Sequence, residues 1–392
     1  MKDKRTPNTD LETIMPILIG AWRRFTKQGG PSDELQTREF REVVECVKKF
    51  QTMTDGETSM IGKDYFENRG LLGSYLLYQW VIHYQEGLSL IGELPETPKR
   101  VLDVCSGPSP YAFAALRHGA NEVFATDQNA TALQLGAEVC GRYGLTLNSR
   151  KWNCLKDPLP VEGKFDLIIL GHCLEELFPS TSKGWPERQQ LFIKSLMAKL
   201  TPNGYLLITD SSFPDANKRV LQLRDKMVED GVPVQAPCVW RGECPALKTA
   251  NSPCFAQREM EKPGLIKQIQ RAAEINLSSL KMTYIIFRNP SAGWPGLPTL
   301  SELPNAKFYR VISPPIESHY GKRYYLCGTD GKKNLGSHGK EQPKESRAFE
   351  YLRRGELIAV EGSQEKPGSM DIIEGTKIKV VAACGKPVEA WE

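Results

Sequence analysis

The chain has 392 residues, of which 40% are hydrophobic and 25% charged, and its formal net charge is +4. These values are ordinary for a soluble globular protein of two or three domains. No apolar run approaches the roughly 18 to 20 residues of a membrane span, and the first residues lack an apolar signal core. We therefore expect a cytoplasmic protein without a membrane partner, in which ten cysteines favour metal binding or catalysis over disulfides.

Residues 1–96 are predicted to form a helical domain. The stretch DELQTREFREVVECVKKF spaces its apolar residues as one face of a helix does. DYFENRGLLGSYLLYQWVIHYQEGLSLI is apolar almost all round, which is typical of a buried helix. GELPETPKR then breaks the pattern and predicts a linker.

Residues 97–290 alternate between strand and helix patterns. Short apolar runs precede helix-like stretches, as in RVLDVCSG, EVFATD, FDLIILG and GYLLITD, and KMTYIIFRN adds a further strand. This alternation predicts an α/β fold with a parallel sheet covered on both faces. A cysteine-containing loop at 237–258 interrupts the domain.

Residues 303–392 follow a Pro/Gly-rich linker and are predicted to form a small β-module. KFYRVIS, RYYLCGTDGKK, GELIAVEG and GTKIKVVAACG resemble short strands, and Asp330-Gly331 is a hairpin signal. From residue 307 to 354, eleven Lys or Arg stand against five Asp or Glu, so 11 − 5 = +6. Such a stretch suits phosphate contacts, or simply a solvated basic face. Aromatic side chains that suit base stacking lie within it, at Tyr309, Tyr320, Tyr324 and Tyr325.

The first strand of the α/β domain ends in a loop suited to a nucleotide-like ligand. In VLDVCSGPSPYAFAALRHGA, Asp103 lies near the strand end, and Gly107 lets the backbone approach a ligand closely. About twenty residues later Asp127 ends the second strand, where a carboxylate can accept hydrogen bonds from ribose hydroxyls. The loop lacks both G-x-G-x-x-G and G-x-x-x-x-G-K, which argues against dinucleotides and nucleoside triphosphates.

This pattern resembles the class I S-adenosylmethionine-dependent methyltransferases and implies their Rossmann-like fold. The usual loop has three glycines at alternate positions, whereas this chain keeps one of them. On the resemblance, the loop holds the methionine end of S-adenosylmethionine, the acid of the second strand binds the ribose, and residues 153 and 154 lie near the adenine. A doubly wound domain that has lost its ligand is the alternative. The implied cofactor residues are Asp103, Cys105, Gly107, Ser109, Asp127, Gln128, Asn153, Cys154 and Gly171.

The segment GHCLEELFPSTS, after the strand FDLIILG, holds the candidates for catalysis. His172, Glu175 and Glu176 suit the positioning of a substrate or the uptake of a proton. Acids at the start of a helix also simply favour the helix dipole. The segment has neither the Asn/Asp-Pro-Pro-aromatic tetrapeptide of amino-directed base methyltransferases nor a Pro-Cys nucleophile, so the catalytic residue stays unassigned.

Three cysteines, Cys238, Cys244 and Cys254, share one Pro-rich loop. Their C-x5-C-x9-C spacing differs from the paired C-x2-C of most structural zinc sites, so a fourth ligand must come from elsewhere. Cys327 of the β-module is the best candidate. Four thiolates from separate segments suit an iron–sulfur cluster, with zinc as the runner-up and unrelated free cysteines as the plain alternative.

Ordered motifs resemble the methyltransferase-like proteins associated with the small ribosomal subunit, best known from mitochondria. The likeness runs from about Tyr65 to Glu356 and includes YFENRGLLGSYLLYQWV, HCLEEL and LLITDSSFPDANKRVLQLRDKMVEDGVPVQAPC. The cysteine consensus appears as CVWRGECPAL and SPCFAQR, without the family's flanking histidines. The resemblance implies a [4Fe–4S] cluster, and a partner that is small-subunit ribosomal RNA or the small ribosomal subunit. The implied cluster ligands are Cys238, Cys244, Cys254 and Cys327.

We therefore expect a monomeric, S-adenosylmethionine-binding methyltransferase-like protein that either methylates small-subunit ribosomal RNA or assists assembly of the subunit. Two alternatives remain open at this point. One is a small-molecule methyltransferase whose helical domain forms a lid over a closed apolar pocket. The other is a redox or iron sensor in which loss of the cluster releases the β-module.

Overall fold

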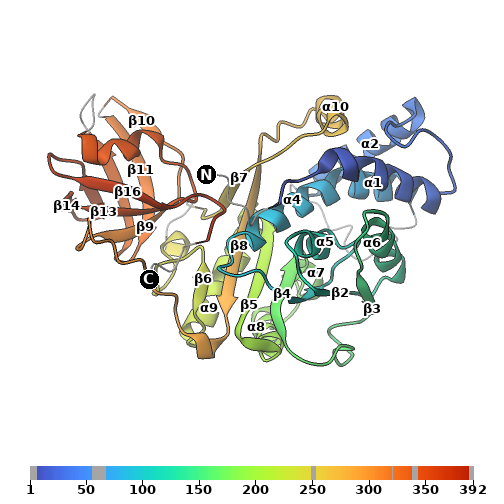
Figure 1. The fold of residues 1–392 in the computed structure, drawn as a ribbon, viewed down its shortest axis with the longest axis horizontal. Coiled ribbons are helices and arrows are strands. Elements are labelled where there is room, and N and C mark those ends of the chain that lie inside the picture. The colour runs from blue at the N-terminus through green and yellow to red at the C-terminus, as the bar shows by residue number, and fades with distance from the viewer. Residues whose placement is uncertain (1–6, 55–67, 249–252, 320, 338–342, 388–392) are drawn as a thin grey trace. The chain divides into compact units, whose positions relative to one another are not determined.

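The computed structural model describes residues 7–54, 68–248, 253–319, 321–337 and 343–387, which form two compact units (Figure 1). Within these ranges no helix is long and apolar enough to cross a membrane. The sequence-based boundaries at 96, 290 and 303 stay a prediction. Unit 1 contains Met1–Ile91, Thr97–Gln189 and Glu259–Leu280. Unit 2 contains Gly92–Glu96, Gln190–Arg258 and Lys281–Glu392.

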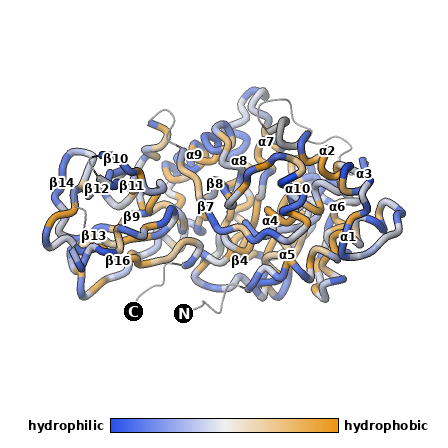
Figure 2. The backbone as a smooth tube through the Cα atoms, turned by 90° about the horizontal axis from the view of Figure 1, so that it is seen from above, coloured by the Kyte–Doolittle hydropathy of each residue, from blue (hydrophilic) through white to orange (hydrophobic). Residues whose placement is uncertain are grey.

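The predicted helical region is confirmed for the described part of unit 1, while Tyr65 lies outside the described residues. Its last three segments follow one another without a break, and the third is buried on nearly every side. Hydrophobic residues recur along it in Figure 2. The segments are α1 (Leu11–Phe25), α2 (Thr37–Thr54), α3 (Arg69–Ser74), the π-helix η1 (Tyr75–Gln79) and α4 (Trp80–Ile91).

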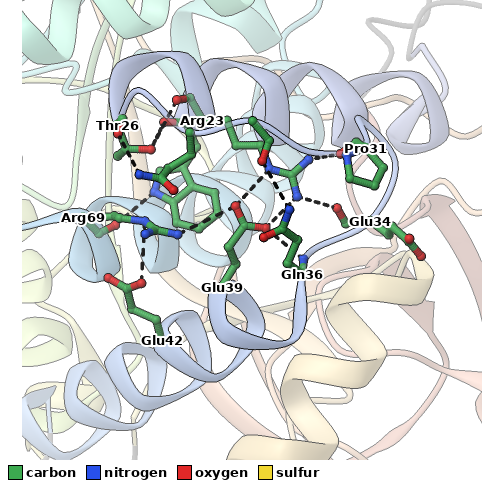
Figure 3. A network of polar contacts seen from close by, with 11 residues as sticks. Arg23, Thr26, Pro31, Glu34, Gln36, Glu39, Glu42 and Arg69 are labelled. Atoms are coloured by element: carbon green, nitrogen blue, oxygen red, sulfur yellow. Dashed lines mark hydrogen bonds and ion pairs between the residues drawn. The ribbon is translucent and has the colours of Figure 1, made fainter.

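A buried ion pair joins α1 to α2 (Figure 3). Arg23 donates from Nε and Nη2 to the Glu39 carboxylate, at 3.0 and 2.6 Å, and also from Nη2 to the Glu34 carbonyl at 2.8 Å. Glu39 further accepts from the Gln36 N–H at 2.8 Å, and the Arg69 guanidinium lies 3.7 Å away. Because Arg23 and Glu39 are hydrogen-bonded to each other and to main-chain groups, the desolvation of these buried charges is compensated.

Four parallel strands make the sheet of unit 1, in the order β3-β2-β1-β4, which confirms the predicted α/β class with a mostly parallel sheet. The strand order reverses between β1 and β4, and in doubly wound sheets ligands bind at this switch point. The strands are β1 (Arg100–Val104), β2 (Glu122–Asp127), β3 (Asn148–Lys151) and β4 (Phe165–Gly171). The helices of this part are α5 (Pro110–Arg117), α6 (Ala130–Arg142), α7 (Leu174–Leu177) and α10 (Gly264–Ala273).

Antiparallel strands form the first part of unit 2. β8 pairs with β5 from Tyr205 opposite Arg288 to Ser211 opposite Met282, and it also pairs with β6 and β7. The elements are β5 (Leu200–Ser211), α9 (Pro214–Glu229), β6 (Val234–Ala236), the 3-10 helix η2 (Pro245–Lys248), β7 (Ala256–Glu259), β8 (Ser279–Arg288) and the 3-10 helix η3 (Pro290–Ala292). Helix α8 (Trp185–Met197) precedes β5.

The β-module, residues 303–392, contains a largely antiparallel sheet, which Figure 1 shows at the labels β9, β10, β11, β13, β14 and β16. Its order is β14-β15-β12-β11-β9-β13-β16, with β10 paired to β11. The predicted hairpin is confirmed: Gly328 pairs with Gly331, whose φ of +94° favours glycine. The elements are β9 (Lys307–Val311), β10 (Ile316–Ser318), β11 (Gly321–Gly328), β12 (Gly331–Ser337), the 3-10 helix η4 (Lys344–Tyr351), β13 (Leu357–Glu361), β14 (Gln364–Lys366), β15 (Ser369–Asp371) and β16 (Lys377–Ala382).

The aromatic residues of the β-module correct one expectation. Tyr309 and Tyr324 are 0% and 1% exposed and pack in its core with Phe349, so they cannot stack on bases. Tyr325 is 41% exposed, and Tyr320 lies outside the described residues. The alternation of strand side chains places Tyr324 inside and Tyr325 outside.

Candidate functional site

The loop after β1 keeps a left-handed backbone at three alternate positions. The φ angles of Cys105, Gly107 and Ser109 are +56°, +51° and +62°. Only the middle residue is glycine, and a non-glycine residue in this conformation costs roughly 1–2 kcal/mol. The chain therefore retains the shape of a loop with three alternate glycines although two of the glycines are replaced. Strain of this kind is concentrated at ligand-binding sites.

Two predicted acids hold this loop, one at its middle residue and one through the helix that follows it. Asp103 accepts a hydrogen bond from the Ala112 N–H at 2.9 Å, while its other oxygen is buried without a protein partner. Burial raises the pKa of Asp103 to about 8; the Ala112 N–H opposes this shift and Asp127 adds to it. The Asp127 carboxylate accepts from the N–H groups of Gly107 and Asn129, at 2.9 and 2.8 Å. Burial raises the pKa of Asp127, although hydrogen bonds from these two N–H groups and from the N–H of Gln128 act to lower it.

Further predicted cofactor residues lie around the same loop. The sulfur atoms of Cys105 and Cys154 are 3.8 Å apart, which brings the end of β3 to the loop of β1. The side chain of the neighbouring Asn153 accepts from the Leu155 N–H at 3.3 Å. The Tyr75 hydroxyl, which the sequence interpretation missed, lies where a Cβ on Gly107 would come within 3.5 Å of it.

The end of β4 brings one catalytic candidate into a partly buried polar cluster. His172, with φ +54°, places its Nε2 2.9 Å from a carboxylate oxygen of Glu86. The Tyr111 hydroxyl donates to that same oxygen at 2.8 Å. The His83 ring stacks on the His172 ring with centroids 4.2 Å apart and an interplanar angle of 15°. Gly171 is required here, because a Cβ on it would lie 2.3 Å from the Tyr111 ring.

The other two catalytic candidates lie differently. Glu175 accepts hydrogen bonds from the Ser180 N–H and hydroxyl, both at 2.9 Å, and so stabilises the turn after α7. Glu176 is exposed on α7. The structure therefore places His172 beside Glu86 and His83, whereas the Glu175 carboxylate accepts hydrogen bonds from Ser180. Glu86 and His83 were missed, although His-x-x-Glu spacing in a helix places both side chains on one face.

All four predicted metal-binding cysteines line one cavity in unit 2. It measures about 60 Å³, and its walls also include the side chains of Arg224, Arg258, Arg310 and Lys332. The lining cysteines are Cys238, Cys244, Cys254 and Cys327. A cavity of that volume exceeds the 10–15 Å³ that one water molecule needs. The arrangement thus combines four soft sulfur atoms that could act as ligands, cationic side chains and room for a group of several atoms.

Helix α9 positions the cysteine loop. The Asn217 amide donates to the Cys254 carbonyl at 2.8 Å, and the Asp225 carboxylate accepts from the Cys244 N–H at 2.9 and 3.0 Å. Arg224 donates to the carbonyls of Trp240 and Gly242. Its side chain is 1% exposed, and its Nε has no hydrogen-bond partner. A buried, unpaired N–H beside sulfur ligands is suited to a bound anionic group.

The fourth cysteine comes from the sheet of the β-module. Cys327 stands in β11 between Arg310 of β9 and Lys332 of β12. Arg310 donates to the Pro237 carbonyl at 3.1 Å and to the Gly355 carbonyl at 2.9 Å, which attaches this strand to the residue preceding Cys238. The sequence pattern identified Cys327, but not the buried arginine opposite it.

The thiols affect one another electrostatically. Burial, and to a smaller extent the Cys238 thiol, raises the pKa of Cys244 to about 11. Burial together with the thiols of Cys238 and Cys244 raises the pKa of Cys327 to about 12. Burial and the three other thiols raise the pKa of Cys254 well above its ordinary value. Burial alone would lower the pKa of Arg224, but Cys238 and Asp225 outweigh it and raise the value. The four groups therefore share one electrostatic environment.

Comparison with known proteins gives one family. Residues 90–350 match the family described as mitochondrial small ribosomal subunit Rsm22. No curated protein sequence matches the chain.

Solved structures with a similar fold include several methyltransferases. The ribosomal protein L11 methylase of Lactobacillus delbrueckii subsp. bulgaricus is 16% identical, with 54% of this chain and 78% of that chain covered and a TM-score of 0.33. The N-methyltransferase NodS of Bradyrhizobium japonicum, in complex with S-adenosyl-L-homocysteine, is 12% identical, with coverages of 62% and 99% and a TM-score of 0.36. A putative RNA methyltransferase of Pyrococcus horikoshii is 14% identical, with 65% and 97% covered and a TM-score of 0.32.

Proposed function

Since the chain belongs to the Rsm22 family, described as mitochondrial small ribosomal subunit Rsm22, we propose that it binds S-adenosylmethionine and a [4Fe–4S] cluster and acts on the small ribosomal subunit. In this proposal it contacts the RNA of that subunit, either to methylate a base or to assist assembly. The proposed protein is a cytoplasmic monomer.

One observation carries the proposal: cysteines from a loop and from a separate strand converge on one cavity with Arg224 beside it. Four thiolates are the usual ligands of a [4Fe–4S] cluster. Their negative charge requires compensation in a buried place, which the 1% exposed guanidinium of Arg224 provides through its unpaired Nε. The residues present therefore fit the group.

The width of the cysteine set favours a cluster over a single zinc ion. Tetrahedral zinc with Zn–S bonds of about 2.3 Å places its sulfur atoms roughly 3.8 Å apart. Across the described ranges, the one set of three or more His, Cys, Asp or Glu whose ligand atoms lie within 4.8 Å of one another contains no cysteine. The thiols instead surround a cavity, as a larger inorganic group requires. When bound, the cluster would link the cysteine loop to β11 and contribute folding free energy.

S-adenosylmethionine would supply the methyl group at the end of β1. The proposed ribose acceptor is Asp127, and the buried unpaired oxygen of Asp103 is available to the ligand. His172 is the proposed residue beside the methyl acceptor, because it follows Gly171 at the switch point of the sheet.

For RNA contact we propose helix η4 of the β-module. In the basic stretch, Arg310 is buried, and Lys307 and Lys322 pair with carboxylates at 3.2 Å, so they are less available to phosphate. Lys344 and Arg347 are exposed on η4, and Tyr351 at its end is 72% exposed. Cations beside an exposed aromatic ring suit phosphate contact and base stacking.

Anaerobic purification tests the cluster. We expect brown protein with about four irons and four sulfides per chain and a broad absorption near roughly 400 nm. The Cys327→Ser variant should lose most of this iron, whereas Cys140→Ser, a buried cysteine of unit 1, should keep it. Colourless wild-type protein that carries one zinc ion per chain would reject the cluster in favour of zinc.

Mass spectrometry of small-subunit ribosomal RNA, from cells with and without the gene, tests the action on RNA. A methyl group that disappears with the gene, and returns with the wild-type copy, identifies an RNA methyltransferase. Unchanged RNA together with defective small subunits identifies an assembly factor. Normal RNA and normal subunits would remove the ribosomal part of the proposal while leaving the cluster test unaffected.

A further inference from the structure

We propose that His83, Glu86 and His172 form a binding site for one divalent transition-metal ion at the end of β4. This site lies in unit 1, separate from the cysteine cavity, and it goes beyond the function proposed above. Its three side chains come from the middle of α4 and from the residue that follows β4. The same three side chains also suit an ordinary hydrogen-bond network, so the experiment must separate the two.

The distances between the three side chains suit a single ion. One ligand atom from each residue lies within 4.8 Å of the other two. His172 Nε2 lies 2.9 Å from a Glu86 carboxylate oxygen. Bonds of about 2.0–2.2 Å from zinc to nitrogen or oxygen place neighbouring ligand atoms roughly 3–3.5 Å apart. The His83 ring stacks on the His172 ring with centroids 4.2 Å apart, so His83 must turn out of this stack for all three atoms to reach one ion.

The backbone holds the three side chains where they are. His83 and Glu86 stand three residues apart in α4, on one face of a helix that is almost fully buried. Directly before α4 runs the π-helix η1, a feature that is frequent at functional sites. His172 is turned toward them by a left-handed backbone, with φ +54°. Such strained geometry persists only where the surrounding structure enforces it.

The carboxylate also has the outer partner that ligands of metals usually have. The Tyr111 hydroxyl donates to the Glu86 oxygen at 2.8 Å and fixes its orientation. The Glu86 side chain is only 3% exposed, so an ion bound to its oxygen would be largely shielded from water on this side.

The type of ligand indicates the type of ion. Two imidazoles and one carboxylate are the ligands of catalytic zinc and of non-haem iron(II), and they leave coordination positions open. An ion here would therefore accept water, or an oxygen or nitrogen atom of a substrate. The site adjoins Gly171, a predicted cofactor residue.

Cobalt(II) titration of the full-length protein, with its cysteine centre already loaded, tests the site. We expect one additional Co²⁺ per chain, with d–d absorption and no added thiolate-to-cobalt charge-transfer band, because no sulfur ligand takes part. His172→Gln and Glu86→Gln should weaken this binding at least tenfold. Tyr111→Phe, which removes only the outer hydrogen bond, should weaken it about tenfold. His319→Gln, an exposed histidine of unit 2, is the matched control and should bind as the wild type does.

Thermal unfolding with Zn²⁺ gives a second readout that shows whether each variant is folded. The wild type and His319→Gln should melt at a higher temperature when Zn²⁺ is added, since an ion that binds only the native state stabilises it. A folded His172→Gln variant should lose this shift. If wild type and His172→Gln take up cobalt with the same stoichiometry and affinity, or if neither takes up any, the three residues form a hydrogen-bond network and the proposed site is rejected.

Discussion

The N–H of Gly107 donates a hydrogen bond to the Asp127 carboxylate at 2.9 Å. This contact joins the loop of β1 to the end of β2, so one side chain both shapes that loop and offers the proposed ribose acceptor. A second N–H, from Asn129, holds the other carboxylate oxygen at 2.8 Å. Loss of the Asp127 carboxylate should therefore both disturb the loop and remove the proposed hydrogen-bond acceptor of the ribose.

Asp127→Ala should reduce the affinity for S-adenosylmethionine at least tenfold, measured by isothermal titration calorimetry. The matched control is Asp166→Ala, because Asp166 also accepts two main-chain N–H groups, those of Lys99 and Arg100 at 3.0 Å, but at the opposite end of the strands. Destabilisation alone would affect both variants. Equal affinity in the wild type and Asp127→Ala would remove this acid from the site.

The left-handed backbone at Cys105 gives a prediction about stability. Cys105→Gly should raise the free energy of unfolding by about 1 kcal/mol relative to Cys105→Ala, since both lose the thiol but only glycine adopts φ +56° without steric cost. Urea denaturation of the two variants measures the difference. A Cys105→Gly variant no more stable than Cys105→Ala would mean that the loop has another conformation in solution.

The sequence predicts those strands whose apolar residues are buried on both faces of the sheet. β1, β2 and β4 are apolar because both faces are covered, and Asp103 and Asp127 stand out at their ends. β3 was missed because its residues, Asn148–Lys151, are polar and form the edge of the sheet. Its pairing with β2 depends on backbone hydrogen bonds, which leave no hydrophobic signal.

The residues of the candidate sites also fall into two groups, those that the sequence predicted and those that it did not. Cysteines are informative in a sequence because few other roles explain a cluster of them, so the three in one loop indicated a metal site. Cys327 was predicted as the fourth ligand that the loop itself does not supply, and it lines the same cavity as the other three. Arg224 and Glu86 were not predicted, because the sequence alone does not distinguish a charged residue that is buried from one that is exposed. Their roles depend on tertiary contacts, with the carbonyls of the cysteine loop in one case and with His172 in the other. Such contacts bring together residues far apart in the chain.

The raised pKa of Asp103 predicts how stability depends on pH. Burial raises its pKa from 3.8 to about 8 in the folded state, so the folded protein keeps a proton that the unfolded chain releases. The stabilising contribution of this proton is complete below about pH 3.8 and is lost as the pH rises through about 8. Asp103→Asn cannot ionise and should not show this loss.

Urea denaturation of the wild type and Asp103→Asn at pH 5 and pH 8 measures the effect. The free energy of unfolding of the wild type, relative to that of the variant, should be smaller at pH 8. Parallel pH dependence in the two proteins would show that the carboxyl group of Asp103 ionises in the folded state much as it does in the unfolded chain.

Arg224 should be essential for the cysteine centre. Arg224→Gln removes the donors to the Trp240 and Gly242 carbonyls and the buried positive charge, so we expect iron per chain to fall to a small fraction of the wild-type value. Lys218→Gln, on an exposed face of the same helix, should leave the iron content unchanged. Metal analysis after anaerobic purification measures both. Full iron in Arg224→Gln would mean that the cysteines alone hold the cluster.

Two aromatic residues of helix η4 separate the stability of the β-module from its proposed contact with RNA. Phe349 is 0% exposed and packs against Tyr324, so Phe349→Ala should cost about 3–5 kcal/mol of unfolding free energy. Tyr351 is 72% exposed, and Tyr351→Ala should change stability by less than about 0.5 kcal/mol. If its ring stacks on a base, the same change should lower RNA affinity by about 1–3 kcal/mol, measured by fluorescence anisotropy with a single-stranded fragment of small-subunit ribosomal RNA. Unchanged RNA affinity in the stable Tyr351→Ala variant would place the RNA contact elsewhere, because the core residues of the module are inaccessible to bases.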